Sequence, residues 1–253
     1  MRSIAEFRSP TSDQFRTDIQ SLGEPAVLRG VAADWPLVKA GDRWMDLLSA
    51  QTNAEPVGIL RADPSEQGRF HYSADGRSLN FVRGRASLPI FLAALQEQAT
   101  EAHPFAMAVQ GLLAERHVPG FGGSHPMPLV PPGTEARLWI GNAAKVATHN
   151  DPTDNIAVVT AGRRRFTLFP PGSEGDLYMG PAHPTPAGTP VSMVHVTAPD
   201  LDRYPRFADA LESAQEAELS PGDALFIPRL WFHHVEALER FNMLVNYWWA
   251  ENR

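Results

Sequence analysis

Three side chains in the second half of the sequence have the types and spacing needed to hold a metal ion. His149 and Asp151 are separated by one residue, and residues i and i+2 of a β-strand point to the same face. An imidazole and a carboxylate placed in this way can bind one metal together. The third ligand must come from elsewhere in the chain. We expect it to be His233, which follows the aromatic pair Trp231-Phe232.

The spacing of the first pair is weak evidence by itself. The chain has 9 His and 29 acidic residues, so His-x-acid pairs also arise by chance. His234 and Glu236 form such a pair, and we expect His234 to pack behind the site rather than bind metal. Two histidines and one carboxylate on one face would form the ligand set of non-haem Fe(II) sites, which keep positions open for other ligands.

The sequence around these side chains predicts a mainly β fold with flanking helices. From Ala136 onward, short apolar runs alternate with Gly, Pro, Asn or Asp, which is typical of an antiparallel sandwich or barrel. The sequence Ser-Pro-Gly-Asp at 220–223 predicts a tight turn. Strands are expected at 137–141, 155–160, 165–169, 191–196, 224–227 and 242–249. We therefore predict a double-stranded β-helix, that is, a jelly roll of eight strands.

The first half predicts a mixture of helices and strands. A helix is expected at 12–22 with Ser12 or Asp13 as its N-cap, and another at 88–96 capped by Ser87. A further helix is expected at 44–50, strands at 26–30 and 57–60, a weaker strand at 69–72, and surface loops at the proline-rich segments 119–132 and 181–190. We predict one domain, 1–253, with a mixed α/β portion (1–120) and a metal-binding jelly-roll portion (121–253).

Composition removes several classes of function. The absence of cysteine excludes disulfides, thiolate zinc sites, iron–sulfur clusters and a cysteine nucleophile. The net charge of -7 disfavours general binding to a phosphate backbone. Because the sequence has neither a secretory signal nor an apolar run of about 18 residues, we expect no membrane association and a cytoplasmic location.

Three blocks of sequence resemble the Jumonji-C and cupin-like oxygenases that depend on Fe(II) and 2-oxoglutarate. The first combines His149-x-Asp151 with Asn155, the sequence Gly-Arg-Arg-Arg at 162–165 and Leu-Phe-Pro-Pro at 168–171. The second runs from Pro-Gly-Asp at 221–223 to the histidines at 233–234, and the third is Val-Asn-Tyr-Trp at 245–248. A looser match at 25–36 extends the resemblance from about residue 20 to the end. The asparaginyl hydroxylases of hypoxia signalling are similar as distant relatives.

The resemblance implies roles for seven residues. His149, Asp151 and His233 would bind Fe(II). Arg164 takes the place of a family lysine that pairs with the distal carboxylate of 2-oxoglutarate, and a guanidinium offers that carboxylate two parallel hydrogen bonds. Strand alternation places either Arg164 inside with its two neighbours outside, or the reverse. Asn155, Asn246 and Trp248 match positions that help to bind the cosubstrate or pack near the metal.

Two positions depart from the family pattern. Val146 stands where a threonine often binds the distal carboxylate of 2-oxoglutarate. Ala108 aligns with a tyrosine that binds the same carboxylate. Both hydroxyl partners would then be missing, which puts the geometry of cosubstrate binding in doubt. The residues that could compensate are Tyr72, Trp139, Thr148 and Thr167.

The resemblance implies a 2-oxoglutarate-dependent dioxygenase, a hydroxylase of a protein side chain or a small molecule. Demethylation is the same chemistry on an N-methyl carbon. We expect such a substrate rather than nucleic acid as the partner, and a monomer or homodimer. Two alternatives remain open: a metal-dependent cupin enzyme that does not use 2-oxoglutarate, and a non-catalytic ligand-binding cupin.

Overall fold

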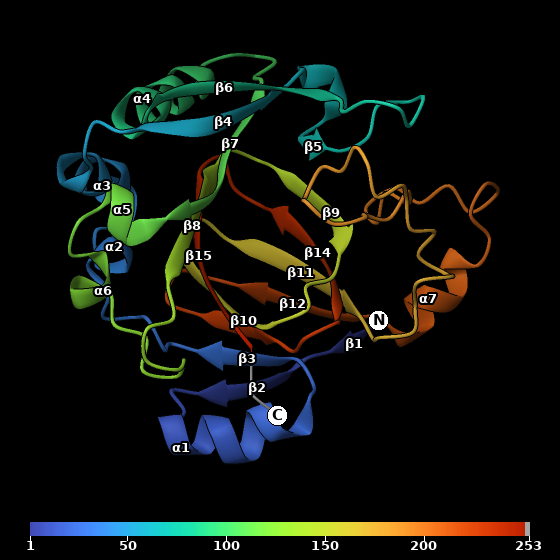
Figure 1. Ribbon diagram of the computed structural model, residues 1–253, viewed down its shortest axis with the longest axis horizontal. Helices are drawn as coiled ribbons and strands as arrows, with labels where there is room; N and C mark the ends of the chain where they lie inside the picture. Colours follow the sequence, from blue (N-terminus) through green and yellow to red (C-terminus); the bar gives the residue numbers. More distant parts are fainter. Residues whose placement is uncertain (251–253) are drawn as a thin grey trace.

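Two β-sheets face each other and close into a barrel in the computed structural model, which describes residues 1–250 (Figure 1). The smaller sheet has six strands in the order β1-β12-β11-β14-β9-β5, and the larger has nine in the order β2-β3-β13-β10-β15-β8-β7-β4-β6. The strands are β1 (Arg2–Ser3), β2 (Ala5–Arg8), β3 (Ala26–Arg29), β4 (Pro56–Ala62), β5 (Arg69–Phe70), β6 (Phe81–Ser87), β7 (Ala106–Leu113), β8 (Ala136–Gly141), β9 (Lys145–His149), β10 (Asp154–Ala161), β11 (Arg164–Phe169), β12 (Gln215–Leu219), β13 (Ala224–Ile227), β14 (Phe232–Ala237) and β15 (Asn242–Trp249).

Eight of these strands form the predicted double-stranded β-helix. Strands β8, β10, β13 and β15 belong to the larger sheet, whereas β9, β11, β12 and β14 belong to the smaller one. Strand β10 is buried along its whole length, because the barrel interior covers one face and a helical layer covers the other. The structure therefore confirms the mainly β, jelly-roll prediction.

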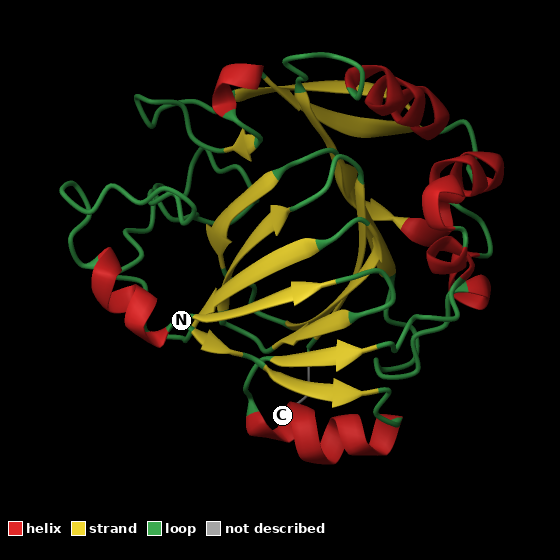
Figure 2. Cartoon of the chain, turned by 180° about the vertical axis from the view of Figure 1, so that it is seen from behind, coloured by secondary structure: helices red, strands yellow, loops and turns green. Residues whose placement is uncertain are grey.

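Helices cover the outer face of the larger sheet, as the view from behind shows (Figure 2). Leu37, Leu48 and Leu92 of this layer join one apolar core with Val158 and Val245 of the sheet. The α-helices are α1 (Ser12–Gln14), α2 (Pro36–Lys39), α3 (Trp44–Gln51), α4 (Leu88–Gln98), α5 (Ala114–His117), α6 (Phe121–Ser124) and α7 (Phe207–Ser213). Shorter turns are the π-helix η1 (Phe15–Ile19) and the 3-10 helices η2 (Gln20–Leu22), η3 (Gly41–Arg43) and η4 (Pro64–Glu66). Within the described chain, no helix combines the length and the apolar character needed to cross a membrane.

Strands of the first 120 residues extend the larger sheet at both of its ends. Strand β3 pairs with β13, and β7 pairs with β8. The two portions thus share one continuous sheet, and the boundary near residue 120 stays a prediction.

The expected strand at 191–196 is wrong. The segment forms only an isolated bridge between Ser192 and Met179, because the Ser192 hydroxyl donates to the Leu177 carbonyl and accepts from the Val194 N–H. The second bond occupies the Val194 N–H, which a longer ladder would need.

The expected helix caps also differ. Thr11, rather than Ser12 or Asp13, caps the first helix and forms a capping box with Gln14. Ser87 occupies the N-cap position of α4 but makes no side-chain capping bond.

Candidate metal centre

Two neighbouring strands of the smaller sheet bring the two predicted histidine ligands together. His149 ends β9 and His233 lies near the start of β14, and the two residues are direct partners in the antiparallel register. Their ring centroids are 4.4 Å apart. Residues that are 84 positions apart in sequence therefore present both imidazoles on the inner face of the barrel.

Backbone carbonyls fix the orientation of both rings. The Nδ1 atom of His149 lies 2.8 Å from the Ala147 oxygen, and that of His233 lies 3.1 Å from the Trp231 oxygen. A neutral ring that donates from Nδ1 carries its free lone pair on Nε2, the arrangement that metal-binding histidines use. Burial, followed by the nearby His149, lowers the pKa of His233, while Asp151 opposes this effect. His233 is thereby kept neutral, as a ligand must be.

Asp151 completes the group from the loop after β9. Its Oδ2 lies 3.8 Å from the Nε2 of His233 and accepts a 3.0 Å hydrogen bond from the Nε1 of Trp248. The Leu230 N–H donates to the Asp151 carbonyl at 2.8 Å, which ties the loop to the turn before His233. One ligand atom from each of the three residues lies within 4.8 Å of the others, and these are donors that suit Fe(II).

A narrow cavity beside the two histidines contains a buried guanidinium. Arg164 is only 7% exposed, and its Nε–H has no hydrogen-bond partner in the described part of the chain. Within residues 1–250 it forms no ion pair, whereas its neighbours Arg163 and Arg165 point outward to glutamates. Burial lowers the pKa of Arg164 to about 10, so it remains a cation at neutral pH. The remaining walls of the cavity are Trp139, Val146, Asn155, Phe166, Ile227, Val235, Leu244, Asn246 and Trp248.

The other predicted site residues surround the same cavity. Asn246 donates to the Asn155 side-chain oxygen at 2.9 Å, across the pair β10 and β15. Trp248 points to Asp151, so its hydrogen bond reaches the expected carboxylate ligand. Sequence reasoning did not single out the apolar walls formed by Phe166 and Leu244, because apolar strand residues carry no chemical signal of their own.

The positions that depart from the family pattern fall in different places. Val146 lines the cavity, whereas Ala108 packs into a separate apolar cluster with Leu60 and Phe81. Of the four residues that could compensate for the missing hydroxyls, Trp139 alone lines the cavity, and its buried Nε1–H has no partner. The other three, Tyr72, Thr148 and Thr167, are not among its walls.

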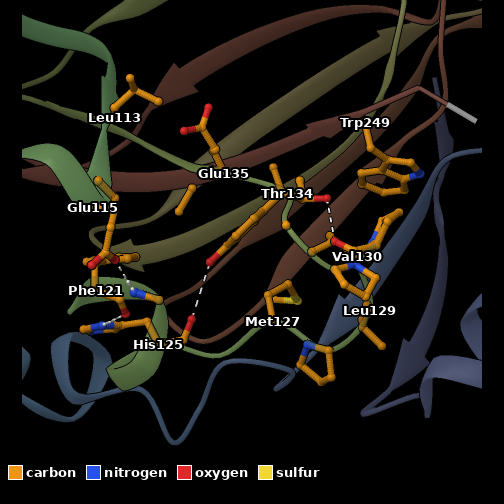
Figure 3. A pocket seen from close by; sticks show the side chains of 18 of the residues that line it. Leu113, Glu115, Phe121, His125, Met127, Leu129, Val130, Thr134, Glu135 and Trp249 are labelled. Atoms are coloured by element: carbon orange, nitrogen blue, oxygen red, sulfur yellow. Dashed lines mark hydrogen bonds between the residues drawn. The ribbon is translucent and has the colours of Figure 1, made fainter. Parts of the chain in front are cut away.

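A larger cavity lies on the outer face of the larger sheet and contains no comparable ligand set (Figure 3). Met127, Leu129 and Trp249 are among its walls. Trp249 and Trp248 are adjacent on β15 and point to opposite faces, so the strand separates this cavity from the metal ligands. The segment 119–132, predicted as a surface loop, contains the short helix α6 and supplies many of the walls.

Comparison with known proteins agrees with this geometry. Residues 12–253 match the family described as "Cupin-like domain". Over 116 residues, 46% of this chain and 21% of the relative, the sequence is 37% identical to "Lysine-specific demethylase JMJ31" of Arabidopsis thaliana. Over 102 residues, 40% of this chain and 29% of the relative, it is 39% identical to "tRNA wybutosine-synthesizing protein 5" of Mus musculus.

A third relative is similar along almost the whole chain. "Lysine-specific demethylase 8" of Danio rerio is 24% identical over 258 residues, which are 98% of this chain and 59% of that protein. The chain thus spans less than two thirds of the length of each of these relatives. Since the family match covers nearly all residues and the jelly roll carries the expected ligand triad, the chain belongs to the cupin-like family of Jumonji-C type.

Proposed function

We propose that this protein is an Fe(II)- and 2-oxoglutarate-dependent oxygenase that hydroxylates a protein side chain or a small molecule. The observation that carries the proposal is the uncompensated Arg164 in the cavity beside the His149 and His233 rings. A buried cation without a partner is costly, and an anionic ligand that binds next to the metal would remove this cost.

The metal ligands fit Fe(II). Two imidazoles, each with Nδ1 turned to a backbone carbonyl, and one carboxylate leave further coordination positions open. When bound, Fe(II) supplies oxygen activation, with 2-oxoglutarate as the electron donor. The chain itself orients the ligands, because Ala147 and Trp231 hold the imidazoles and Trp248 holds the carboxylate.

The cavity fits the distal carboxylate of 2-oxoglutarate. Arg164 provides a full positive charge, and the Trp139 Nε1–H provides a second buried donor that lacks a partner. Together they offer the hydrogen bonds that the missing threonine and tyrosine hydroxyls give in the family. Phe166 and Leu244 are apolar walls that exclude water from this contact, which strengthens its electrostatic part.

The substrate is proposed from charge and from the relatives' names. The net charge of -7 favours a protein or small molecule over a phosphate backbone, and two relatives are named as lysine demethylases. One relative is named for tRNA wybutosine synthesis, which makes RNA the first competitor to test. We further propose a cytoplasmic monomer or homodimer.

A metal-dependent cupin enzyme that does not use 2-oxoglutarate is the second candidate. The loss of both family hydroxyls, with Val146 in one of these positions, favours it. The burial of Arg164 opposes it, because an enzyme without an anionic cosubstrate gains nothing from this cation. A non-catalytic ligand-binding cupin would have no use for the complete triad.

Anaerobic titration of the Fe(II)-loaded protein with 2-oxoglutarate tests the proposal. We expect a visible metal-to-ligand charge-transfer band that His149→Ala abolishes. Arg164→Met should weaken the apparent affinity for 2-oxoglutarate at least tenfold, since it removes a charge-assisted pair. Arg163→Met is the matched control, because Arg163 is the exposed neighbour and its loss should leave the titration unchanged. Iron binding without the band would favour the second candidate, and failure to bind iron would refute the proposed Fe(II)-dependent oxygenase.

A further inference from the structure

A second cluster of basic side chains lies on the outer face of the smaller sheet. Arg69, His71, Lys145, His195 and His234 line one small pocket there, and no carboxylate is among its walls. The remaining walls are Ala147, Val194, Val196 and Thr197. The chain as a whole is acidic, with a net charge of -7. The gathering of five basic side chains around one opening is therefore a local feature that the overall composition does not explain.

The positive charge of this pocket is poorly compensated. Within residues 1–250 Arg69 forms no ion pair, and Lys145 has one, with Glu236 at the long distance of 3.9 Å. The Nε2 atom of His234 is buried and has no hydrogen-bond partner among the residues that the structure describes, and the residue is only 6% exposed. A buried polar atom without a partner requires an explanation, and here the surrounding groups point to a missing anion.

Backbone contacts hold the segment that contributes His195 in place. The Ser192 N–H donates to the Thr148 carbonyl at 2.8 Å, and the Nε2 of His71 lies 2.9 Å from the Ser192 oxygen. The rings of His71 and His195 are 4.8 Å apart. The pocket is therefore built by tertiary contacts, and its basic groups are held together although they repel one another when charged.

We propose that this pocket binds a single oxyanion, namely a phosphate group. Arg69 and Lys145 supply permanent positive charge, and a histidine Nε2 can meet an ionised or a protonated phosphate oxygen. The pocket is small, which favours one small oxyanion over a larger molecule. A transition metal fits poorly, because two cations line the pocket and the triad on the inner face is the one set of three clustered ligands in residues 1–250.

The pKa of His195 reflects its burial and, to a smaller extent, the basic groups around it. Burial, followed by the nearby His71 and Arg69, lowers the pKa of His195 to about 4. Negative charge in the pocket would offset that repulsion.

An oxyanion in this pocket would touch both strands that hold the metal. Lys145 begins β9, which ends in His149, and His234 follows His233 on β14. The proposed ligand would thus contact the outer face of the two strands whose inner face carries the histidine ligands. The proposal does not depend on the nature of the reaction.

Calorimetric titration of the metal-free protein with sodium phosphate, at pH 7.5 and constant ionic strength set with sodium chloride, tests the proposal. We expect one saturable site in the wild type and in Arg164→Met, which removes the other buried cation. The double variant Arg69→Gln/His195→Gln should bind at least tenfold more weakly, and the exposed control Arg77→Gln should bind like the wild type. Methyl phosphate should bind as well as phosphate if the natural ligand is a phosphate ester, and at least tenfold more weakly if it is the free ion.

Three results would overturn the proposal. The first is the absence of a saturable site in the wild type, and the second is a site lost in Arg164→Met but kept in the double variant. The third is equal weakening by Arg77→Gln, which would show only general charge attraction. Histidine-ring NMR spectra keep the test valid if the double variant unfolds, because phosphate must then shift the His195 resonances of the wild type at the concentrations that produce heat.

Discussion

The hydrogen bond from Trp248 to Asp151 makes metal affinity depend on a residue that is not a ligand. Its length of 3.0 Å and its carboxylate acceptor place it among charge-assisted bonds, which contribute about 1.5–3 kcal/mol. The Asp151 side chain is 25% exposed, so water can replace part of the lost bond. We therefore expect Trp248→Phe to weaken divalent metal binding about tenfold, at the lower end of the range for residues that orient metal ligands.

Titration with Mn(II), with free Mn(II) measured by its electron paramagnetic resonance signal, gives the dissociation constant directly. Trp249→Phe is the matched control, because Trp249 is the next residue on β15 and belongs to the apolar core on the other face. It should lower stability without changing Mn(II) affinity. Asp151→Ala should abolish binding. Equal dissociation constants for the wild type and Trp248→Phe would refute the argument that this indole orients the carboxylate.

Three further variants test other parts of the structure. Arg164→Met should raise the free energy of unfolding in urea by about 1–4 kcal/mol without cosubstrate, because it replaces an uncompensated buried charge with an apolar side chain; a loss of stability would contradict this. The pKa of His195 is about 4 in the folded protein and 6.5 ordinarily. Between these values the His195 ring is protonated only in the unfolded chain, so the free energy of unfolding falls as the pH drops through this window. His195→Gln should flatten that slope in urea melts at pH 4 to 7, and an unchanged slope would assign it to other groups. Gly162→Ala should cost about 2–3 kcal/mol in the same melts, since the backbone φ is +69° and the new Cβ would meet the Phe241 oxygen at 2.4 Å; a variant as stable as the wild type would show that the turn can shift.

The sequence predicted the jelly roll because its strands are separated by turn residues. Strand β13 occupies the predicted range 224–227, and the predicted turn at 220–223 closes with a 3.0 Å bond from the Asp223 N–H to the Ser220 carbonyl. Strand β12 was missed, since Gln215–Leu219 is mostly polar and pairs through its outward glutamates with Arg165. Such a strand forms because it pairs with strands that are distant in sequence, and a local sequence pattern carries no information about these partners.

For the site, sequence motifs identified the residues but not the contacts between them. His149 and His233 were named from motifs, whereas their direct pairing depends on the register of β9 and β14. Alternation left two orientations for Arg164, and the structure places this side chain inside. The contact of Trp248 with Asp151 follows from the pairing of β15 with β10 and could not be read from either segment alone.

Because β14 has two adjacent histidines, two different pairings of this strand with its neighbours could present an imidazole to the metal. If β14 slipped by one residue against its neighbours, His234 would point into the barrel in place of His233, and a mispaired strand would still offer an imidazole to the metal. The same slip would move Glu236 from Arg165 and Lys145, at 3.4 and 3.9 Å, into an apolar interior at a cost of several kcal/mol. An imidazole facing the metal would therefore not by itself distinguish the two pairings, whereas the cost of burying the Glu236 carboxylate disfavours the slipped one.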